Sequence, residues 1–159
     1  MDEPKPKKTI GRAEKLQFPE LNFVDVYARI DTGAATSAIW ASRVEAQDGV
    51  LQVTFFGKES PHFTGQTVQF SDFDTTVVAS STGEAQQRYV VTLLVGLRGR
   101  RVRAKFTLAD RSTQVYPVLI GRNVLRGKFI VDVKHGKTLR TQEKKRTESL
   151  RQQLDGTKE

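Results

Sequence analysis

The stretch from residue 88 to residue 108 restricts the fold more than any other part of the chain. It reads RYVVTLLVGLRGRRVRAKFTL, with runs rich in apolar and β-branched residues on both sides of GLRGR. Two such runs separated by a short loop that contains glycine are typical of a β-hairpin. The sequence therefore predicts two adjacent antiparallel strands in the second half of the chain.

Short strand-like runs recur along the rest of the chain. Residues 23–30, FVDVYARI, alternate apolar and polar side chains with an interruption at Asp25, and they predict a strand that leads to Asp31. The segment 34–44, AATSAIWASRV, lacks this alternation and is expected to hold a short turn before the next strand. Further strands are expected at 50–57, 66–70, 117–121 and 128–133, one helical turn at 122–127, and a second hairpin around the small polar tip at 80–84.

About seven short strands with little helix predict an all-β fold, either a closed barrel or a compact sandwich. A chain of 159 residues fits one domain with tails. We expect a flexible lead-in at residues 1–15 and the folded domain at 16–134. Residues 135–159 are basic and polar, and they are expected to form a frayed helix or a disordered tail.

The residue types that are missing exclude several kinds of chemistry. The chain has no cysteine, which rules out disulfides, thiolate catalysis and cysteine-based zinc sites. Its two histidines, His62 and His135, lie far apart, and neither a His-Glu-x-x-His motif nor a Gly-rich Lys-Ser/Thr loop is present. We therefore predict no metal and no cofactor. No run approaches the roughly 18 apolar residues of a membrane span, and no secretory signal is visible, so a cytoplasmic location is expected.

The polar segment that carries most information is RIDTGAATSAIW at residues 29–40, in which Asp31 follows an apolar strand. Asp-Thr-Gly alone fits a tight turn, where the aspartate accepts backbone N–H groups and the glycine supplies a positive φ. It also fits one half of a catalytic carboxylate pair. About 90 residues later comes VLIGRNVL, and a hairpin with a small tip lies between the two segments. This combination is much more specific than the tripeptide.

Over residues 22–133 the order and spacing of these features resemble the retropepsin-like aspartic peptidases. The resemblance implies an acid-protease lobe with a closed β-barrel, a flap hairpin and one short helix. In that family the Asp-Thr-Gly strand delivers the catalytic carboxylate, and the apolar-apolar-Gly segment passes beneath it. The resemblance therefore implies that Asp31 is catalytic, that Thr32, Gly33, Ala34 and Gly121 support it, and that Val78, Ser80, Ser81, Thr82 and Gly83 of the flap contact a peptide substrate.

A chain with a single Asp-Thr-Gly supplies only one of the two carboxylates that this chemistry needs. Symmetry is the simplest source of the second, so we expect a homodimer that places Asp31 against Asp31 of a second copy. The resemblance implies that Thr32 then hydrogen-bonds across the dimer and that Gly33 donates its N–H group to the carboxylate.

Within the superfamily the chain is similar to a bacterial branch that is often found beside ATP-grasp glutamate ligases of the RimK type. TIGRAEKLQFPEL before Asp31 and FTLADRSTQVYPVLIGRNVL after it carry this similarity. The branch has also been labelled an ATP-dependent zinc protease, for which the motifs are missing here. The similarity and the net charge of +8 together suggest trimming of glutamate-rich tails on a ribosomal protein. The alternative is a non-catalytic β-domain that binds peptides, RNA or the ribosome.

Two positions depart from the retroviral pattern. The residue four positions after the catalytic aspartate is usually acidic and pairs with the arginine of Gly-Arg-Asn, but it is Ala35 here. If Arg122 is buried, it therefore needs another acceptor, such as Asp25, Asp132 or a backbone carbonyl group. The Asp-Arg-Ser at 110–112 has no counterpart in the retroviral pattern.

Four arginines are candidates for contacts with an acidic substrate: Arg88, Arg101, Arg103 and Arg111. For Arg101 and Arg103 the alternative is a solvated strand face whose charge protects a sheet edge. For Arg111 the alternative is a loop salt bridge with Asp110 or a neighbour.

Overall fold

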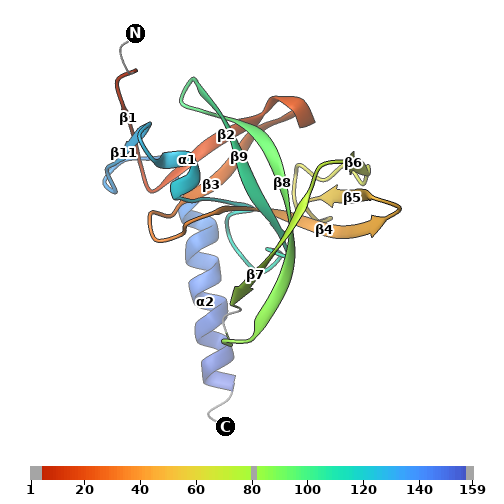
Figure 1. Ribbon diagram of the computed structural model, residues 1–159. Helices are drawn as coiled ribbons and strands as arrows, with labels where there is room; N and C mark the ends of the chain where they lie inside the picture. The colour runs from red at the N-terminus through yellow and green to blue at the C-terminus, as the bar shows by residue number, and fades with distance from the viewer. Residues whose placement is uncertain (1–4, 80–81, 157–159) are drawn as a thin grey trace.

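Residues 5–79 and 82–156 are described by a computed structural model, in which a β-rich body carries a long C-terminal helix (Figure 1). In chain order the elements are β1 (Lys8–Ile10), β2 (Ala13–Phe18), the 3-10 helix η1 (Pro19–Leu21), β3 (Phe23–Ile30), β4 (Ser37–Gln47), β5 (Val50–Phe55), β6 (Val68–Phe70), β7 (Asp74–Ala79), β8 (Ala85–Leu97), β9 (Arg100–Ala109), β10 (Val118–Ile120), α1 (Arg122–Leu125), β11 (Phe129–Val131) and α2 (Arg140–Gly156).

Most strands belong to one nine-stranded sheet that returns onto itself. Its hydrogen-bonded order is β10-β3-β2-β8-β9-β4-β5-β6, and β7 pairs with the first half of β8. Because β10 pairs in parallel with β3 and antiparallel with β4, the strands from β3 round to β4 form a ring. β1 and β11 form a separate two-stranded sheet. This arrangement confirms the predicted all-β class.

The hairpin predicted within residues 88–108 is formed by β8 and β9, which pair from Val90 and Thr107 to Leu97 and Arg100. Its turn consists of Arg98 with φ 51° and Gly99 with φ 77°. Two positive φ values give a turn whose twist matches that of the flanking strands. The strands predicted near 23–30, 50–57, 66–70, 117–121 and 128–133 are present as β3, β5, β6, β10 and β11, and the predicted helical turn is α1.

The expectation for residues 34–44 was wrong in part. The turn is confined to the start of this segment, because the 11-residue strand β4 begins at Ser37. Its first five residues are all buried, which means that the side chains on both faces of the strand are covered. A strand that is covered on both faces shows no alternation of apolar and polar residues. The pattern search therefore missed it.

The interruption at Asp25 is a bulge that changes which side chains of β3 face inward. Asp25 has φ 53°, and the pairing of β2 with β3 shifts register beside it. The side chain of Gln17 stabilises the bulge, since its Oε1 accepts the Asp25 N–H group at 3.0 Å. As a result Phe23 and Val26 are both buried, whereas Val24, which was expected on the apolar face, is 63% exposed.

The hydrophobic core fills the space enclosed by the ring of strands. Aromatic rings pack edge to face in it, with centroids 4.8 Å apart for Phe23 and Phe56 and 5.7 Å apart for Phe18 and Phe106. Close packing of this kind holds the strands in fixed positions. The loops at the ends of β3 and β10 are therefore carried by a rigid frame.

The C-terminal segment, expected to be a frayed helix or disordered, contains the 17-residue helix α2. None of its residues is buried, and in Figure 1 it extends below the ring of strands, in the same direction as the hairpin of β7 and β8. The chain that leads into it crosses the start of β2 closely, because Lys137 donates its N–H group to the Ala13 carbonyl group at 2.6 Å. Within the described ranges, no helix combines the length and the apolar character that a membrane crossing requires.

Candidate active site

Asp31 lies directly after β3, beside the end of β10. The two strands run in parallel, with Ile30 paired to Ile120. The Asp31 N–H group donates to the Ile120 carbonyl group at 2.8 Å. Because the last residue of each strand is buried in the core, the pair delivers Asp31 and Gly121 to the same edge of the ring.

The loop after Asp31 folds back onto its carboxylate. The Gly33 N–H group donates to Asp31 Oδ1 at 3.0 Å, and the Ala34 N–H group donates to the Asp31 carbonyl group at 3.3 Å. A hydrogen bond from a backbone N–H group fixes the orientation of the carboxylate. Asp31 is half-buried, whereas Thr32 and Gly33 are exposed. The loop therefore holds its carboxylate in place while its tip stays open to solvent.

Gly121 allows the start of α1 to pass directly beneath this loop. A Cβ atom at Gly121 would lie 2.8 Å from the carbonyl oxygens of both Ala34 and Thr36. The Arg122 N–H group donates to the Ala34 carbonyl group at 2.8 Å, and the Asn123 N–H group donates to the Ala35 carbonyl group at 3.2 Å. The glycine is therefore needed for close approach, because any side chain would push the loop outward.

Two polar side chains that the sequence analysis did not select fix the same junction. Ser37 Oγ accepts the Gly121 N–H group at 2.9 Å and donates to Asn123 Oδ1 at 2.8 Å. Asn123 Nδ2 in turn donates to the Lys105 carbonyl group of β9 at 2.8 Å. Ser37 is fully buried, and a serine at the start of an otherwise apolar run was the available signal. These bonds connect the Asp31 loop, α1 and β9.

Gly121→Ala is expected to destabilise the protein by about 1–3 kcal/mol, the usual cost of inserting a methyl group into a filled space. The clash is with backbone atoms, which cannot rotate away as a side chain can. Urea unfolding followed by circular dichroism measures the effect. Gly156→Ala is the matched control, because a Cβ atom there meets nothing within 4 Å. Equal stability of the two variants would contradict the packing argument.

Arg122 is exposed, and its Nη1 donates to the Thr32 carbonyl group at 3.1 Å. Arg122 therefore donates to a backbone carbonyl group, in place of the acidic side chain that is missing at Ala35. Because the guanidinium group remains in contact with solvent, it needs no buried carboxylate. Asp25 and Asp132, the other candidates, are engaged with Gln17 and with the Lys134 N–H group.

The hairpin of β7 and the first half of β8 extends beyond the ring of strands, as Figure 1 shows. Val78 is paired with Gln86 and is half-buried, and Gly83 lies in the connecting turn with φ 83°. Thr82 is in the same turn. The candidate flap residues Ser80 and Ser81 lie outside the described residues.

Electrostatic interactions connect Arg111, in the loop after β9, with Arg29 on β3 and Arg88 on β8. Burial, followed by the positive charges of Arg29 and Arg88, lowers the pKa of Arg111 from its ordinary value to about 10. The negative charge of Asp31 opposes this shift. Of the predicted set, Arg88 and Arg111 thus act on one another, and Asp31 acts on Arg111. The third arginine, Arg29, was missed because an arginine in an alternating strand looks like an ordinary solvent-facing residue.

These three arginines form no ion pair with any aspartate or glutamate of residues 5–79 and 82–156. Other cations on the same sheet are neutralised, since Arg103 contacts Glu20 at 3.0 Å and Lys105 contacts Asp74 at 3.6 Å. Clustered positive charges without counter-ions disfavour folding and are typical of sites that bind anions. Arg101 and Arg103, the remaining candidates, are not among the charges that act on Arg111.

The two histidines lie in separate surroundings. The ring of His62 packs against Phe56 with centroids 5.5 Å apart, and burial lowers its pKa while Asp25 opposes the shift. His135 lies 3.5 Å from Asp132. In the part of the chain that the structure describes, no three His, Asp or Glu side chains are grouped so as to hold a metal ion.

The sequence of the chain is similar to that of a known protein family and to those of individual proteins. Residues 9–143 match the profile of a family described as RimB-like, retropepsin-like aspartic endopeptidase RimB. A probable alpha-L-glutamate ligase of Shewanella pealeana is 30% identical over 132 residues, which cover 79% of this chain and 28% of the ligase. One from Desulfotalea psychrophila is 29% identical over 130 residues with the same coverage. The chain thus spans little more than a quarter of the length of these relatives.

The fold is also found in a solved structure. The crystal structure of a protein of unknown function from Legionella pneumophila aligns with a TM-score of 0.55 and 21% sequence identity. The alignment covers 84% of this chain and 98% of the Legionella protein. At this level of identity the likeness concerns the fold alone.

Proposed function

Because the chain belongs to the RimB-like family of retropepsin-like aspartic endopeptidases, we propose that it is a homodimeric aspartic endopeptidase in which two Asp31 carboxylates activate water. The setting of Asp31 carries this proposal. One carboxylate oxygen is held by the Gly33 N–H group at 3.0 Å, and the loop tip at Thr32 and Gly33 is open to solvent. Since each chain has one Asp-Thr-Gly, the second carboxylate must come from a second subunit.

The chemistry follows from two carboxylates about 3 Å apart, which cannot both be ionised and therefore share one proton. The pair titrates as a unit. The ionised carboxylate accepts a proton from a bound water molecule as the water oxygen attacks the carbonyl carbon of the peptide bond. The protonated carboxylic acid donates to the carbonyl oxygen. The tetrahedral diol intermediate then collapses. The carboxyl group that took the water proton donates it to the leaving nitrogen, the other carboxylate accepts a proton from a diol hydroxyl group, and the C–N bond breaks, without a covalent enzyme intermediate.

In this proposal the hairpin of β7 and β8 is the flap. A peptide lies between the hairpin and the Asp31 loop and pairs with both through its main chain, as an added β-strand. Closure of the hairpin excludes bulk water from the site. Val78, Thr82 and Gly83 are then placed to contact the substrate from above.

We assign an acidic peptide, with glutamate side chains near the scissile bond, as the substrate. The support is the group of Arg29, Arg88 and Arg111, whose positive charges act on Arg111 together and which form no ion pair among the described residues. Asp31 supplies the negative charge that acts on Arg111. The relatives are named probable alpha-L-glutamate ligases. A peptidase domain that occurs within chains so named fits a role in removing glutamate residues that a ligase has added. A ribosomal protein that carries such a tail is the substrate we propose.

Dependence of the rate on protein concentration tests the dimer. We expect the hydrolysis rate per chain to fall on dilution, together with a shift from dimer to monomer in sedimentation. Wild-type chains mixed with an equal amount of Asp31→Asn chains and allowed to exchange should show about a quarter of the activity of pure wild-type dimers at the same total chain concentration, because only dimers with two intact subunits work. Constant activity per chain in a monomeric sample would contradict the proposal.

The net charge of +8 favours one further candidate, a domain that binds RNA or the ribosome without cleaving anything. Binding of that kind depends steeply on salt and on the lysines and arginines of the tails. Under the peptidase proposal, neutralising Lys144 and Lys145 leaves the hydrolysis of short peptides unchanged. Measurement of peptide hydrolysis and RNA affinity on the same variant separates the two functions.

A further inference from the structure

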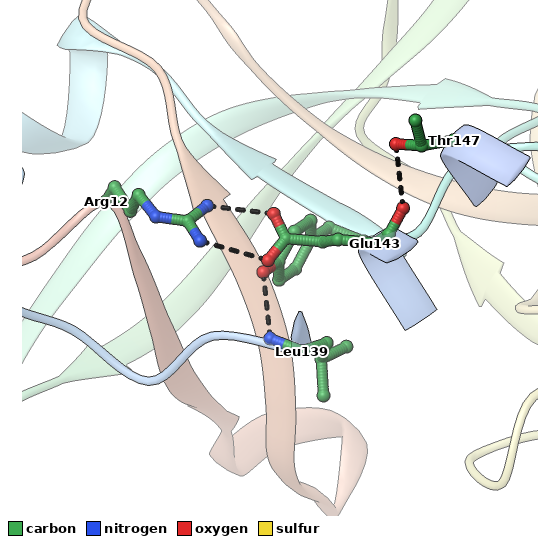
Figure 2. A network of polar contacts seen from close by, with 5 residues as sticks. Arg12, Leu139, Glu143 and Thr147 are labelled. Atoms are coloured by element: carbon green, nitrogen blue, oxygen red, sulfur yellow. Dashed lines mark hydrogen bonds and ion pairs between the residues drawn. The ribbon is translucent and has the colours of Figure 1, made fainter. Parts of the chain in front are cut away.

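The base of α2 is fixed to the body by a paired set of charged groups. Glu143, in the first turn of α2, accepts from Arg12 Nη1 at 2.8 Å and from Arg12 Nη2 at 3.0 Å (Figure 2). The side chains of Arg12 and Glu143 are 42% and 29% exposed. A bidentate ion pair of this kind fixes the relative orientation of the guanidinium and carboxylate groups as well as their distance. Its hydrogen bond with Arg12 lowers the pKa of Glu143, so the carboxylate is ionised at neutral pH.

Tyr116, in the loop between β9 and β10, joins this contact. Its side chain is buried, and its hydroxyl oxygen accepts the N–H group of Leu139, the residue before α2, at 3.0 Å. After Arg12, the hydroxyl group of Tyr116 also lowers the pKa of Glu143. The tyrosine hydroxyl therefore ties the start of α2 to the loop that carries Arg111.

The backbone of Tyr116 faces the candidate site. Its carbonyl oxygen accepts from Arg111 Nε at 3.0 Å. Across residues 5–79 and 82–156 this is the single hydrogen bond recorded for the Arg111 side chain. Tyr116 thus holds the start of α2 through its hydroxyl group. It holds the guanidinium group of Arg111 through its carbonyl group.

Arg12 also reaches the site through its backbone. Its carbonyl oxygen accepts the N–H group of Ile30, the residue before Asp31, at 2.9 Å. Its own N–H group donates to the His135 carbonyl group at 3.2 Å. The base of α2 is therefore connected both to the strand end that presents Asp31 and to the loop that presents Arg111.

Core formation does not account for this arrangement, because α2 contributes no buried residue. We propose that docking of α2 through Arg12, Glu143 and Tyr116 positions Arg111, and thereby sets how tightly the site binds an acidic peptide. These three are positioning residues, since their side chains act on the substrate only through Arg111. This inference rests on the proposed peptidase function and adds to it a determinant of substrate affinity that lies outside the catalytic loop.

Two conservative variants test the inference. Tyr116→Phe removes the hydroxyl group but keeps the ring and the backbone carbonyl, and Glu143→Gln removes the charge but keeps the shape. For a hexaglutamate peptide we expect KM to rise about three- to tenfold in each, the effect of losing one or two polar contacts. For hexaglutamate we expect kcat to change less than twofold, because only substrate binding is weakened. For a matched peptide in which half of the glutamates are replaced by glutamine, we expect kcat/KM to change less than twofold.

Thr147→Ala is the matched control, because Thr147 donates to the Glu143 carbonyl group within α2 and does not touch Arg12 (Figure 2). The double variant Arg12→Glu/Glu143→Arg keeps the ion pair with its charges exchanged. Its KM for hexaglutamate should therefore be closer to the wild-type value than the KM of Glu143→Gln. A purely structural role predicts instead that both peptides and the urea midpoint change together.

The outcomes separate the two proposals. If the wild type cleaves hexaglutamate and the variants show unchanged KM, or equal loss on both peptides, the positioning role is overturned and the peptidase function stands. If the wild type neither binds hexaglutamate in calorimetry nor cleaves it, the substrate assignment and this inference fail together. A selective rise in KM that the exchanged pair reverses supports the inference.

Discussion

Asp31→Asn in both subunits is expected to lower the rate of peptide hydrolysis by about 100- to 10,000-fold, the usual contribution of a positioned general acid or base. Asparagine has nearly the shape of aspartate, but it neither accepts the proton of the attacking water nor shares a proton with a second carboxylate. Its side-chain oxygen still accepts the Gly33 N–H group, so the loop should keep its conformation. Initial rates on a glutamate-rich peptide, followed by mass spectrometry across a range of pH, measure the effect.

Asp48→Asn is the control for this substitution. Asp48 lies exposed in the turn between β4 and β5 with φ 52°, a backbone conformation that asparagine adopts readily. We expect wild-type activity from it, and an unchanged dimer in sedimentation from both variants. Undiminished cleavage by Asp31→Asn, from a preparation free of other peptidases, would eliminate the proposed mechanism.

Arg111→Met should raise KM for a glutamate-rich peptide by about 10- to 100-fold, because a hydrogen bond to a charged group contributes roughly 1.5–3 kcal/mol. Methionine keeps the apolar stem of the side chain and removes the charge. The matched peptide with half of its glutamates replaced by glutamine should be affected less. Arg101→Met is the control, since Arg101 is exposed on β9 and does not act on Arg111.

The same substitution is not expected to destabilise the protein. Burial and the neighbouring arginines lower the pKa of Arg111 to about 10, below its ordinary value. The charged form is therefore disfavoured by folding at every pH below about 10, and removal of the charge removes that cost. The urea midpoint should stay equal or rise, as is common when a binding residue is removed from a strained site. A fall in stability with equal loss on both peptides would indicate a structural role instead.

The elements that were predictable from the sequence are those with local signals. The hairpin of β8 and β9 is indicated by two runs rich in apolar and β-branched residues around a turn with glycine, and the candidate Asp31 by Asp-Thr-Gly together with VLIGRN. β4 has no such signal, because burial on both faces removes the alternation that marks a half-buried strand. The bulge at Asp25 depends on Gln17 from another strand, and no single segment reveals it.

The arginine cluster was predictable only in part for a related reason. Arg88 and Arg111 are separated by the whole of β9, and Arg29 lies about 60 positions before Arg88, so only the closed ring brings their charges together. The contact of Arg12 with Glu143 spans 131 positions. Helix-forming residues in the C-terminal segment are compatible with α2, but its attachment depends on this long-range contact.

The closure of the ring by β10 also determines when the site can exist. The three residues of β10 hold both β3 and β4, the strands on either side of the Asp31 loop. The Asp31 N–H group donates to the carbonyl group of Ile120, which lies about 90 positions later in the chain. A chain that is still being synthesised and has not yet released Ile120 cannot form this bond. Contacts so distant in sequence form late and slowly in folding. Under the proposed function, a growing chain is therefore harmless to acidic segments around it, and the first appearance of hydrolysis during refolding marks the moment at which the ring closes.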